Sequence, residues 1–311
     1  MDKTETFCIA GHFIDVVFAE TNAGDMELLP SFEPFRKKEA SNGGKLFTLR
    51  VDDGLRPLPK DESERIGSFD TGNGDTIVSC TADGRYQYII KDIYGNSCCL
   101  LQTDSNFSHA VCALNGNSQM RHFGLNNALM MTYAFRGSFF KTLLIHASLV
   151  RENDYGYAFI AKSGTGKSTH TSLWLKHIPG TDLMNDDNPI VRIIDGQAYI
   201  YGSPWSGKTP CYRDVKARLG AITQIARDTT NYVEPLSPTK AFAHILPACS
   251  TMKWHKEVFR NTYDTVISLI EVSPHNYILH CLPNKEAALV CHNAISLTAN
   301  DDCGLRHEDK A

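Results

Sequence analysis

The sequence has no apolar run long enough to cross a membrane. Its longest ones, residues 9–19 and 125–135, are interrupted by polar side chains such as His12 and Asn126. Because a membrane-spanning helix needs about 20 predominantly apolar residues, we expect no membrane partner. Residues 1–5 also lack the basic start and apolar core of a secretory signal. We therefore expect a cytoplasmic protein.

Neither sign of charge is in large excess. The chain carries 31 Lys and Arg residues against 35 Asp and Glu residues, which gives a formal net charge of −4. Nucleic-acid-binding domains usually need a basic excess to attract the phosphate backbone. The charge balance therefore predicts no nucleic-acid partner.

The cysteines form no recognisable framework. Ten are scattered over the 311 residues, and no two stand in a Cys-x-x-Cys pair. Structural zinc sites and small disulfide-rich domains both depend on closely spaced cysteines. We therefore expect neither a zinc site nor a structural disulfide.

The length and composition are those of a globular protein. Hydrophobic residues make up 42% and charged residues 21% of the 311 residues, so the chain is expected to bury a core. A length of this kind favours about two domains. Differences in local pattern divide the chain into residues 1–120 and residues 121–311.

Residues 1–120 have the pattern of an antiparallel β-rich module. Two alternating runs, 76–82 and 85–91, flank Asp83-Gly84, a pair typical of a two-residue hairpin turn. Gly95-Asn96 leads into another run, 97–102, so we predict a meander of hairpins. The polar stretch 57–68 is expected to be a long exposed connection, and loop-forming clusters occur at 41–44, 52–54 and 72–75.

Residues 121–311 alternate between strand and helix patterns, which predicts an α/β domain with a mixed sheet. The predicted helices are 124–136, 167–177, 239–248 and 283–294. The predicted strands are 142–150, 157–161, 183–184, 190–194, 197–201, 219–226, 266–272 and 277–282.

A glycine-containing segment between the strand near 160 and the helix at 167 has the pattern of a phosphate-binding loop. Small residues let the backbone N–H groups face phosphate oxygens, and the following helix N-terminus adds partial positive charge. The residues expected to bind nucleotide are Ala161, Lys162, Ser163, Gly164, Thr165, Gly166, Lys167, Ser168 and Thr169. The alternative is a glycine-rich connection without a ligand.

Within this loop two residues have specific expected roles. Lys167 would bridge the β- and γ-phosphates, and the hydroxyl of Ser168 would bind Mg²⁺. The first position of the pattern is Ala161, where glycine is commoner. The inner glycines, Gly164 and Gly166, approach the ligand most closely and are both present.

A pair of carboxylates follows shortly after the loop. Asp186 and Asp187 end a short strand, at the edge of the sheet where α/β proteins bind ligands. One carboxylate can hold Mg²⁺ while the other accepts a proton from an attacking hydroxyl. Neighbouring strand residues point to opposite faces, so one of the two could instead be structural. An exposed acidic turn is the other alternative.

The strand 146–150, the loop beginning at Ala161 and the pair Asp186-Asp187 together resemble the catalytic domain of HPr kinase/phosphorylase and, more distantly, ATP-dependent phosphoenolpyruvate carboxykinase. The resemblance covers about 143–225 and extends toward 295. It implies a P-loop-containing mixed sheet of the HPr kinase/PEP carboxykinase type. It also implies that His146 is an active-site residue near the transferred phosphate and that Asp187 is the general base, which leaves Asp186 for the metal.

A second loop, 202–208, contains Lys208 and Trp205 and is similar to a loop in relatives of HPr kinase and of free-serine kinases. Lys208 is therefore a candidate catalytic residue that reaches phosphate or an acidic acceptor. Trp205 would line the site or stack on a ring. The alternative is a turn with a surface lysine.

These observations predict an ATP-dependent, Mg²⁺-requiring phosphotransferase. Its hydroxyl acceptor would be a serine in a protein or a small metabolite such as free serine. A non-catalytic nucleotide-binding regulatory or scaffold protein is the alternative, and a reverse, phosphorolytic activity like that of HPr kinase/phosphorylase is a third hypothesis. The sequence does not determine the acceptor or the preferred nucleotide base. It also leaves the oligomeric state open, and a homo-oligomer is one alternative.

Overall fold

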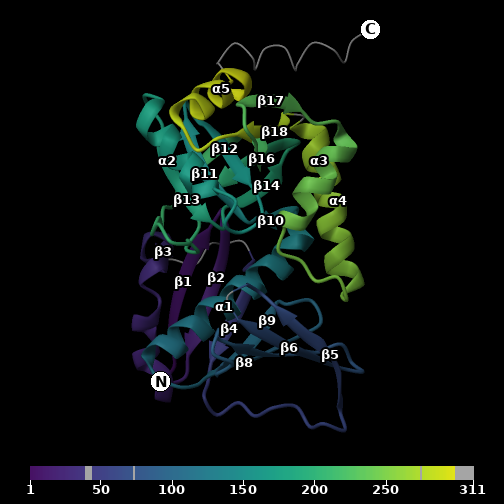
Figure 1. Ribbon diagram of the computed structural model, residues 1–311. Helices are drawn as coiled ribbons and strands as arrows, with labels where there is room; N and C mark the ends of the chain where they lie inside the picture. The colour runs from purple at the N-terminus through teal and green to yellow at the C-terminus, as the bar shows by residue number, and fades with distance from the viewer. Residues whose placement is uncertain (39–43, 73, 274, 298–311) are drawn as a thin grey trace. The chain divides into compact units, whose positions relative to one another are not determined.

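The computed structural model describes residues 1–38, 44–72, 74–273 and 275–297. Its chain forms two compact units, the first made of Met1–Phe140 with Thr251–Phe259 and the second of Lys141–Ser250 with the described part of Arg260–Ala311 (Figure 1). The expected division at 120/121 falls inside helix α1 (Ser118–Gly137), whose residues all belong to the first unit.

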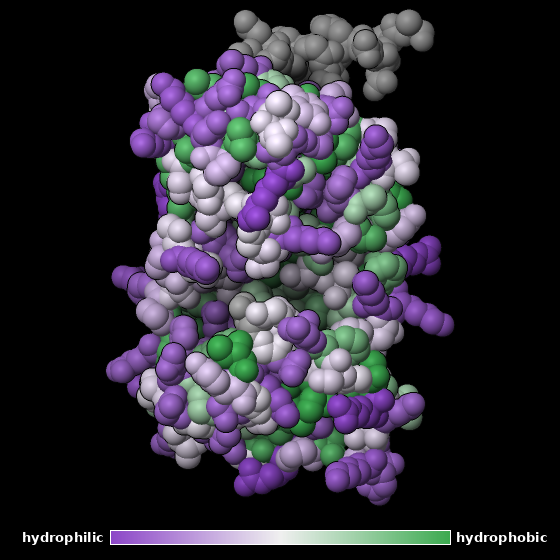
Figure 2. Space-filling view, in the orientation of Figure 1, coloured by the Kyte–Doolittle hydropathy of each residue, from purple (hydrophilic) through white to green (hydrophobic). Residues whose placement is uncertain are grey.

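The surface is mixed in character. On the face shown in Figure 2, hydrophobic residues are interspersed among hydrophilic ones. Among the described residues, no helix combines the length and the apolar character that crossing a membrane requires.

The first unit contains a nine-stranded mixed sheet in the order β3-β1-β2-β4-β9-β8-β7-β6-β5. The strands are β1 (Lys3–Ile9), β2 (His12–Phe18), β3 (Arg36–Lys37), β4 (Phe47–Val51), β5 (Ser63–Asp70), β6 (Asp75–Thr81), β7 (Tyr86–Lys91), β8 (Ser97–Thr103) and β9 (His109–Leu114). Two 3₁₀ segments, η1 (Glu20–Leu28) and η2 (Pro30–Phe35), follow β2.

The predicted meander is confirmed. Strands β5 to β9 follow one another as antiparallel neighbours. The turn between β6 and β7 contains Gly84, whose φ of +82° lies in the left-handed region that glycine adopts without strain. The turn before β8 contains Gly95, also at φ +82°.

Two expectations for the first unit are wrong. The sheet is not wholly antiparallel, because β4 pairs in parallel with both β2 and β9. The stretch expected to be an exposed connection contains β5. No residue of this edge strand is fully buried, and its sequence shows no apolar alternation. Its residue Phe69 stacks on Trp254, with the two ring centroids 4.0 Å apart. Trp254 is remote in sequence, and local pattern therefore gave no sign of the contact. The cluster at 41–44 lies outside the described residues except for Gly44.

The pattern at 124–136 predicted a buried helix, and the structure has one there, α1, but it packs on the sheet of the first unit and not on that of the second. Its N-cap residue Asn117 accepts a hydrogen bond from the N–H of Met120 at 3.0 Å. The hydroxyl of Tyr133 donates to the carbonyl of Ile9 at 3.0 Å, which ties the helix to β1. Gly124 permits the close approach, because a Cβ there would lie 2.7 Å from the carbonyl oxygen of Cys98.

The second unit contains a nine-stranded mixed sheet. Its main path is β10-β14-β15-β16-β12-β11-β13, and β18 joins β16 to the edge strand β17. The strands are β10 (Thr142–Leu144), β11 (Ala147–Glu152), β12 (Tyr155–Ile160), β13 (Asp182–Asp187), β14 (Ile190–Ile194), β15 (Gln197–Tyr201), β16 (Lys216–Arg227), β17 (Tyr232–Pro235) and β18 (Asn276–Cys281). Only β12, β16 and β18 run parallel to one another among the described pairs.

Helices cover both faces of this sheet (Figure 1). On one face α2 (Lys167–His177) and α5 (Lys285–Ile295) pack around Trp174, Phe159 and Cys291. On the other, α3 (Pro238–Ile245) and the part of α4 (Lys256–Val272) from Arg260 onward pack around Leu149 and Leu269. A sheet covered on both sides explains why every residue of β12 is buried.

Short 3₁₀ segments, η3 (Ser138–Phe140) and η4 (Leu246–Ala248), follow α1 and α3. The predicted α/β class, with a mixed sheet after a β-rich N-terminal part, is confirmed.

Two predicted strands of the second unit differ in the structure. The run 266–272 is the end of α4, because a short apolar run of β-branched residues fits a buried helix as well as a strand. The predicted strand 142–150 is broken into β10 and β11 at Ile145 and His146. The N–H of His146 donates to the carbonyl of Ala248 at 2.7 Å instead of continuing the strand pairing.

Candidate active site

The loop 161–166 connects the buried strand β12 to helix α2, so the predicted strand, loop and helix occur in the predicted order. Gly164 and Gly166 have φ angles of +75° and +128°, which glycine adopts at low cost. A Cβ at either position would meet no atom within 4 Å. Gly166 is the N-cap of α2 and provides no side-chain cap, so the helix N-terminus faces an open surface that suits an anion.

Lys167 is the most buried charged residue of the loop, with only 9% of its surface exposed. Its Nζ lies 2.7 Å from Nε2 of His146 and donates to the carbonyl of Ala161 at 3.2 Å. Burial lowers the pKa of Lys167, while the nearby carboxylates of Asp187 and Asp186 act in the opposite direction. The ammonium group is thus partly desolvated. Its two hydrogen-bond acceptors carry no full negative charge, so an anion would bind it more strongly than they do.

His146 links the loop lysine to Asp187. Its Nε2 faces Lys167, and its Nδ1 lies 3.0 Å from Oδ1 of Asp187. An ammonium group can only donate hydrogen bonds, so Nε2 must accept and Nδ1 must carry the hydrogen that faces Asp187. The break between β10 and β11 places His146 here. The predicted proximity of His146, Lys167 and Asp187 is therefore observed.

Asp187 has an unusual backbone conformation. Its φ is +139°, a region that non-glycine residues rarely adopt. It ends β13, where it pairs with Ala147 and forms a bridge with Ser206. The side-chain amide of Asn188 donates to its Oδ2 at 2.7 Å. Backbone strain of this kind concentrates at functional sites, where surrounding contacts hold it in place.

Asp186 faces the start of α2. Its Oδ1 accepts hydrogen bonds from Ser148 at 2.7 Å and from Ser168 at 2.9 Å. Because Asp186 is only 4% exposed, the alternative of an exposed acidic turn is wrong. Neighbouring residues of an extended strand point to opposite faces, but the backbone of Asp187 is not extended. Its carboxylate can therefore lie on the same side as that of Asp186, and both acids contact residues of the site.

The chemistry of Ser168 and Asp186 fits Mg²⁺. Both present oxygen atoms, and this cation usually binds through one or two carboxylates together with substrate phosphates and water. In the part of the chain that the structure describes, no group of three or more His, Cys, Asp or Glu side chains is arranged to hold a metal. The two oxygens therefore fit a metal that arrives with phosphate groups better than one held by protein ligands alone.

The second loop is fastened to the end of β13. Asn185, which is fully buried, donates from Nδ2 to Ser203 Oγ at 3.2 Å and to the carbonyl of Trp205 at 3.1 Å. The hydroxyl of Ser206 donates to the carbonyl of Asp186 at 3.0 Å, and the N–H of Gly207 donates to the same oxygen. The role of Asn185 was not predicted from the sequence, although an amide beside two carboxylates at a strand end was a visible sign.

Lys208 and Trp205 lie differently within this loop. The side chain of Lys208 is exposed, beside Gly207, and makes no described hydrogen bond or ion pair to the acids. Trp205 is only 2% exposed. Its burial contradicts the expectation that it stacks on a ligand ring, and the tryptophan belongs to the core beneath the loop.

The other loop residues line the rim of the site. Lys162, Ser163, Ser168 and Thr169 are exposed, and Ala161 and Thr165 are half-buried. One further residue touches this loop that sequence analysis did not identify. Arg227, at the end of β16, donates from Nε to the carbonyl of Thr165 at 3.1 Å and from a terminal nitrogen to that of Gly164 at 2.6 Å.

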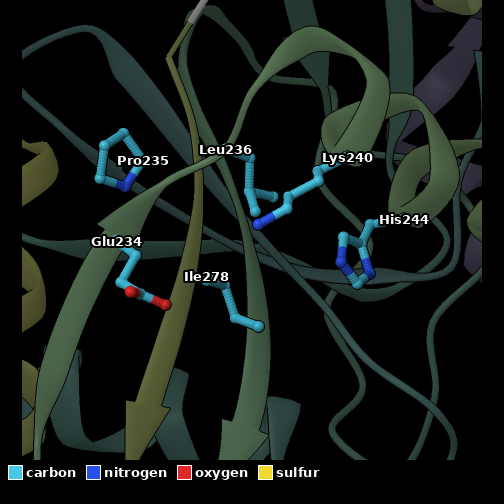
Figure 3. Close-up of a pocket in the computed structure, with 6 residues that line it drawn as sticks. All are labelled: Glu234, Pro235, Leu236, Lys240, His244 and Ile278. Carbon is cyan, nitrogen blue, oxygen red and sulfur yellow. The ribbon is translucent and has the colours of Figure 1, made fainter.

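A separate pocket of about 310 Å³ lies elsewhere in the second unit, between β17, β18 and α3 (Figure 3). Its lining residues are Glu234, Pro235, Leu236, Lys240, His244 and Ile278. None of them belongs to the site around Lys167. The candidate active site lies at the carboxyl end of β12, where the loop 161–166 begins.

Comparison with models of protein families gives no match, and comparison with curated proteins gives none either. The site is thus characterised by its own contacts, which join Lys167 to His146, His146 to Asp187, and Ser168 to Asp186.

Proposed function

We propose that the chain is an ATP-dependent, Mg²⁺-requiring phosphotransferase that acts on a hydroxyl group. The acceptor is a serine in a protein or a small metabolite such as free serine. The observation that carries the proposal is the linked arrangement of Lys167, His146 and Asp187, with Ser168 and Asp186 joined beside it. The residues proposed as the phosphate-binding lysine, the two metal ligands and the carboxylate base are thereby within one site.

The loop 161–169 would hold the phosphates of ATP. Its two glycines leave open space in front of the backbone, and α2 presents the N–H groups of its first turn toward that space. Lys167 would move its ammonium group from His146 to the β- and γ-phosphates, a stronger partner because it is anionic. These contacts neutralise charge that develops during transfer.

Ser168 and Asp186 would hold the magnesium ion. When bound, Mg²⁺ supplies positive charge that stabilises the phosphate oxygens. Ser148 has a supporting role, because it is fully buried and its hydroxyl fixes Oδ1 of Asp186 in place. Ser148 also lies 3.0 Å from the hydroxyl of Thr171, so the support extends into α2.

Asp187 would accept the proton of the attacking hydroxyl. His146 donates from Nδ1 to one of its oxygens, and Asn188 donates to the other. Both hydrogen bonds hold the carboxylate in one orientation. Exposed Lys208 is proposed to approach an anionic group of the acceptor from the neighbouring loop.

The order of the elements supports a relationship to the HPr kinase/PEP carboxykinase type. Residues 146–150, the loop and the acid pair come together because β11 lies between β12 and β13 in the sheet. Ala147 pairs with both Ile160 and Asp187, which brings the start of β11 beside the ends of β12 and β13.

The test is transfer of label from γ-labelled ATP with Mg²⁺ to pooled amino acids, metabolites and cell proteins. Label on a hydroxyl compound, absent with Lys167→Ala, is the expected result. Binding of Mg·ATP without transfer to any acceptor would instead favour the non-catalytic nucleotide-binding alternative. Release of pyrophosphate from the labelled product with inorganic phosphate would reveal the reverse reaction.

A further inference from the structure

Arg227 makes two hydrogen bonds to consecutive carbonyls of the loop. Its Nε donates to Thr165 and a terminal nitrogen donates to Gly164, at 3.1 and 2.6 Å. The register of the sheet explains how it reaches them. Ile160, the last residue of β12, pairs with Gln224, and β16 continues to Arg227. The end of β16 therefore stands beside the loop that follows β12.

Holding these carbonyls fixes the direction of the neighbouring N–H groups. In a trans peptide unit the C=O and the next N–H point in opposite directions. The N–H groups of Thr165 and Gly166 therefore point away from the guanidinium. The first donates to the carbonyl of Lys162 at 3.2 Å and closes a turn. The second lies at the N-cap of α2, next to Lys167.

We propose that Arg227 is a positioning residue for the phosphates of the nucleotide. Its guanidinium holds the carbonyls of Gly164 and Thr165 outward, so that the N–H of Gly166 faces the bound phosphate. The inference rests on the proposed function. Gly164 and Gly166 lack the side chain that restricts φ and ψ in other residues, so a contact from outside the loop helps to select one loop conformation. Arginine suits this role because its planar fork reaches two acceptors at once.

The experiment uses the full chain and titrates Mg·ATP into the wild type, Arg227→Ala and Arg227→Lys. A matched control is Arg260→Ala, which removes another exposed arginine of the second unit, one that lies 3.7 Å from Asp264. We expect Kd to rise about tenfold in Arg227→Ala and less in Arg227→Lys, since a charge-assisted hydrogen bond contributes on this order. The control should stay within about twofold of the wild type.

Kinetics separate positioning from a merely structural role. In Arg227→Ala the KM for Mg·ATP should rise with Kd, while kcat changes by less than about threefold because the guanidinium does not touch the reacting atoms. Without nucleotide, amide hydrogen exchange should accelerate at 163–168, in the loop and the start of α2. Exchange in the strands of the sheet should stay unchanged. A uniform acceleration would mean that the variant has only lost global stability, which contradicts the inference.

The two proposals fail in different ways. If the wild type binds Mg·ATP and Arg227→Ala binds it equally well, the role of Arg227 is wrong while the proposed function stands. If the wild type binds no Mg·ATP but the loop of Arg227→Ala exchanges faster, the proposed function is wrong, and Arg227 orders the loop for another purpose.

Discussion

The Nζ atom of Lys167 lies 2.7 Å from Nε2 of His146. The lysine that would grip phosphate is thus held by a neutral imidazole, whose other nitrogen faces Asp187. Phosphate offers the ammonium a full negative charge, which the imidazole does not. The contact therefore keeps Lys167 in place without competing strongly against the nucleotide.

Replacing Lys167 by alanine should abolish phosphoryl transfer while the fold persists. The variant loses the ammonium that neutralises phosphate charge, a loss of about a hundredfold or more in rate. It also removes a buried cation, so the melting temperature should not fall greatly. Transfer assays and thermal unfolding measure the two effects. Lys176→Ala, which removes an exposed lysine from the same helix, should leave transfer unchanged.

Asp187 should be needed for transfer but not for nucleotide binding. In Asp187→Asn the side chain keeps its shape and loses its basicity, so turnover should fall by about 10² to 10⁴. Mg·ATP titration should give a Kd near that of the wild type. Near-normal turnover of this variant would show that another group accepts the proton.

The backbone of Asp187 gives a stability prediction that is independent of catalysis. Both Asp187→Gly and Asp187→Ala remove the carboxylate, but only glycine adopts φ +139° without strain. Asp187→Gly should therefore be more stable than Asp187→Ala by about 1 kcal/mol. Urea unfolding of the two variants measures the difference. At an ordinary strand position the order is reversed, so greater stability of the alanine variant would contradict the strained conformation.

Ser148 should control the affinity for Mg²⁺. Ser148→Ala removes one of the two hydroxyl groups that bind Oδ1 of buried Asp186, and a hydrogen bond to a charged group contributes about 1.5–3 kcal/mol. We expect transfer to need about tenfold more Mg²⁺, with little change in maximal rate. The control Ser172→Ala removes an exposed hydroxyl of α2. An unchanged Mg²⁺ requirement in Ser148→Ala would mean that Asp186 needs no such support.

His170 should make stability depend on pH. Burial lowers its pKa to about 4, and its Nε2 accepts a hydrogen bond from Trp174 at 3.0 Å, which a protonated ring could not do. Its ordinary pKa is about 6.5, so the unfolded chain binds more protons below that pH. Stability is therefore lost as pH falls from 6.5 toward 4.

Between pH 7.5 and pH 5 this loss should reach about 2 kcal/mol. Urea unfolding at the two pH values measures it, and His170→Phe should reduce the difference by most of that amount. An equal pH dependence in the wild type and His170→Phe would place the effect on another group.

The local part of the site could be predicted from the sequence. The turn of glycines between β12 and α2 is encoded by neighbouring residues, and α2 has the predicted bounds Lys167–His177. The convergence of His146 with Asp187 followed from the resemblance to HPr kinase, not from the residue pattern.

The rest depends on contacts between distant segments. The support from Arg227 requires the register of β16 against β12, and the role of Asn185 requires the path of the loop after β15. A local sequence pattern predicts neither the register between two strands nor the path of a loop. The same reason explains the errors at β5 and α4, where tertiary contacts outweighed the local pattern.

The most direct test of the central claim is calorimetric titration of the full chain with Mg·ATP. The account predicts one nucleotide bound per chain, with binding greatly weakened in Lys167→Ala and retained in Asp187→Asn. No heat from Mg·ATP in the wild type across several temperatures, or equal binding in the wild type and Lys167→Ala, would contradict it.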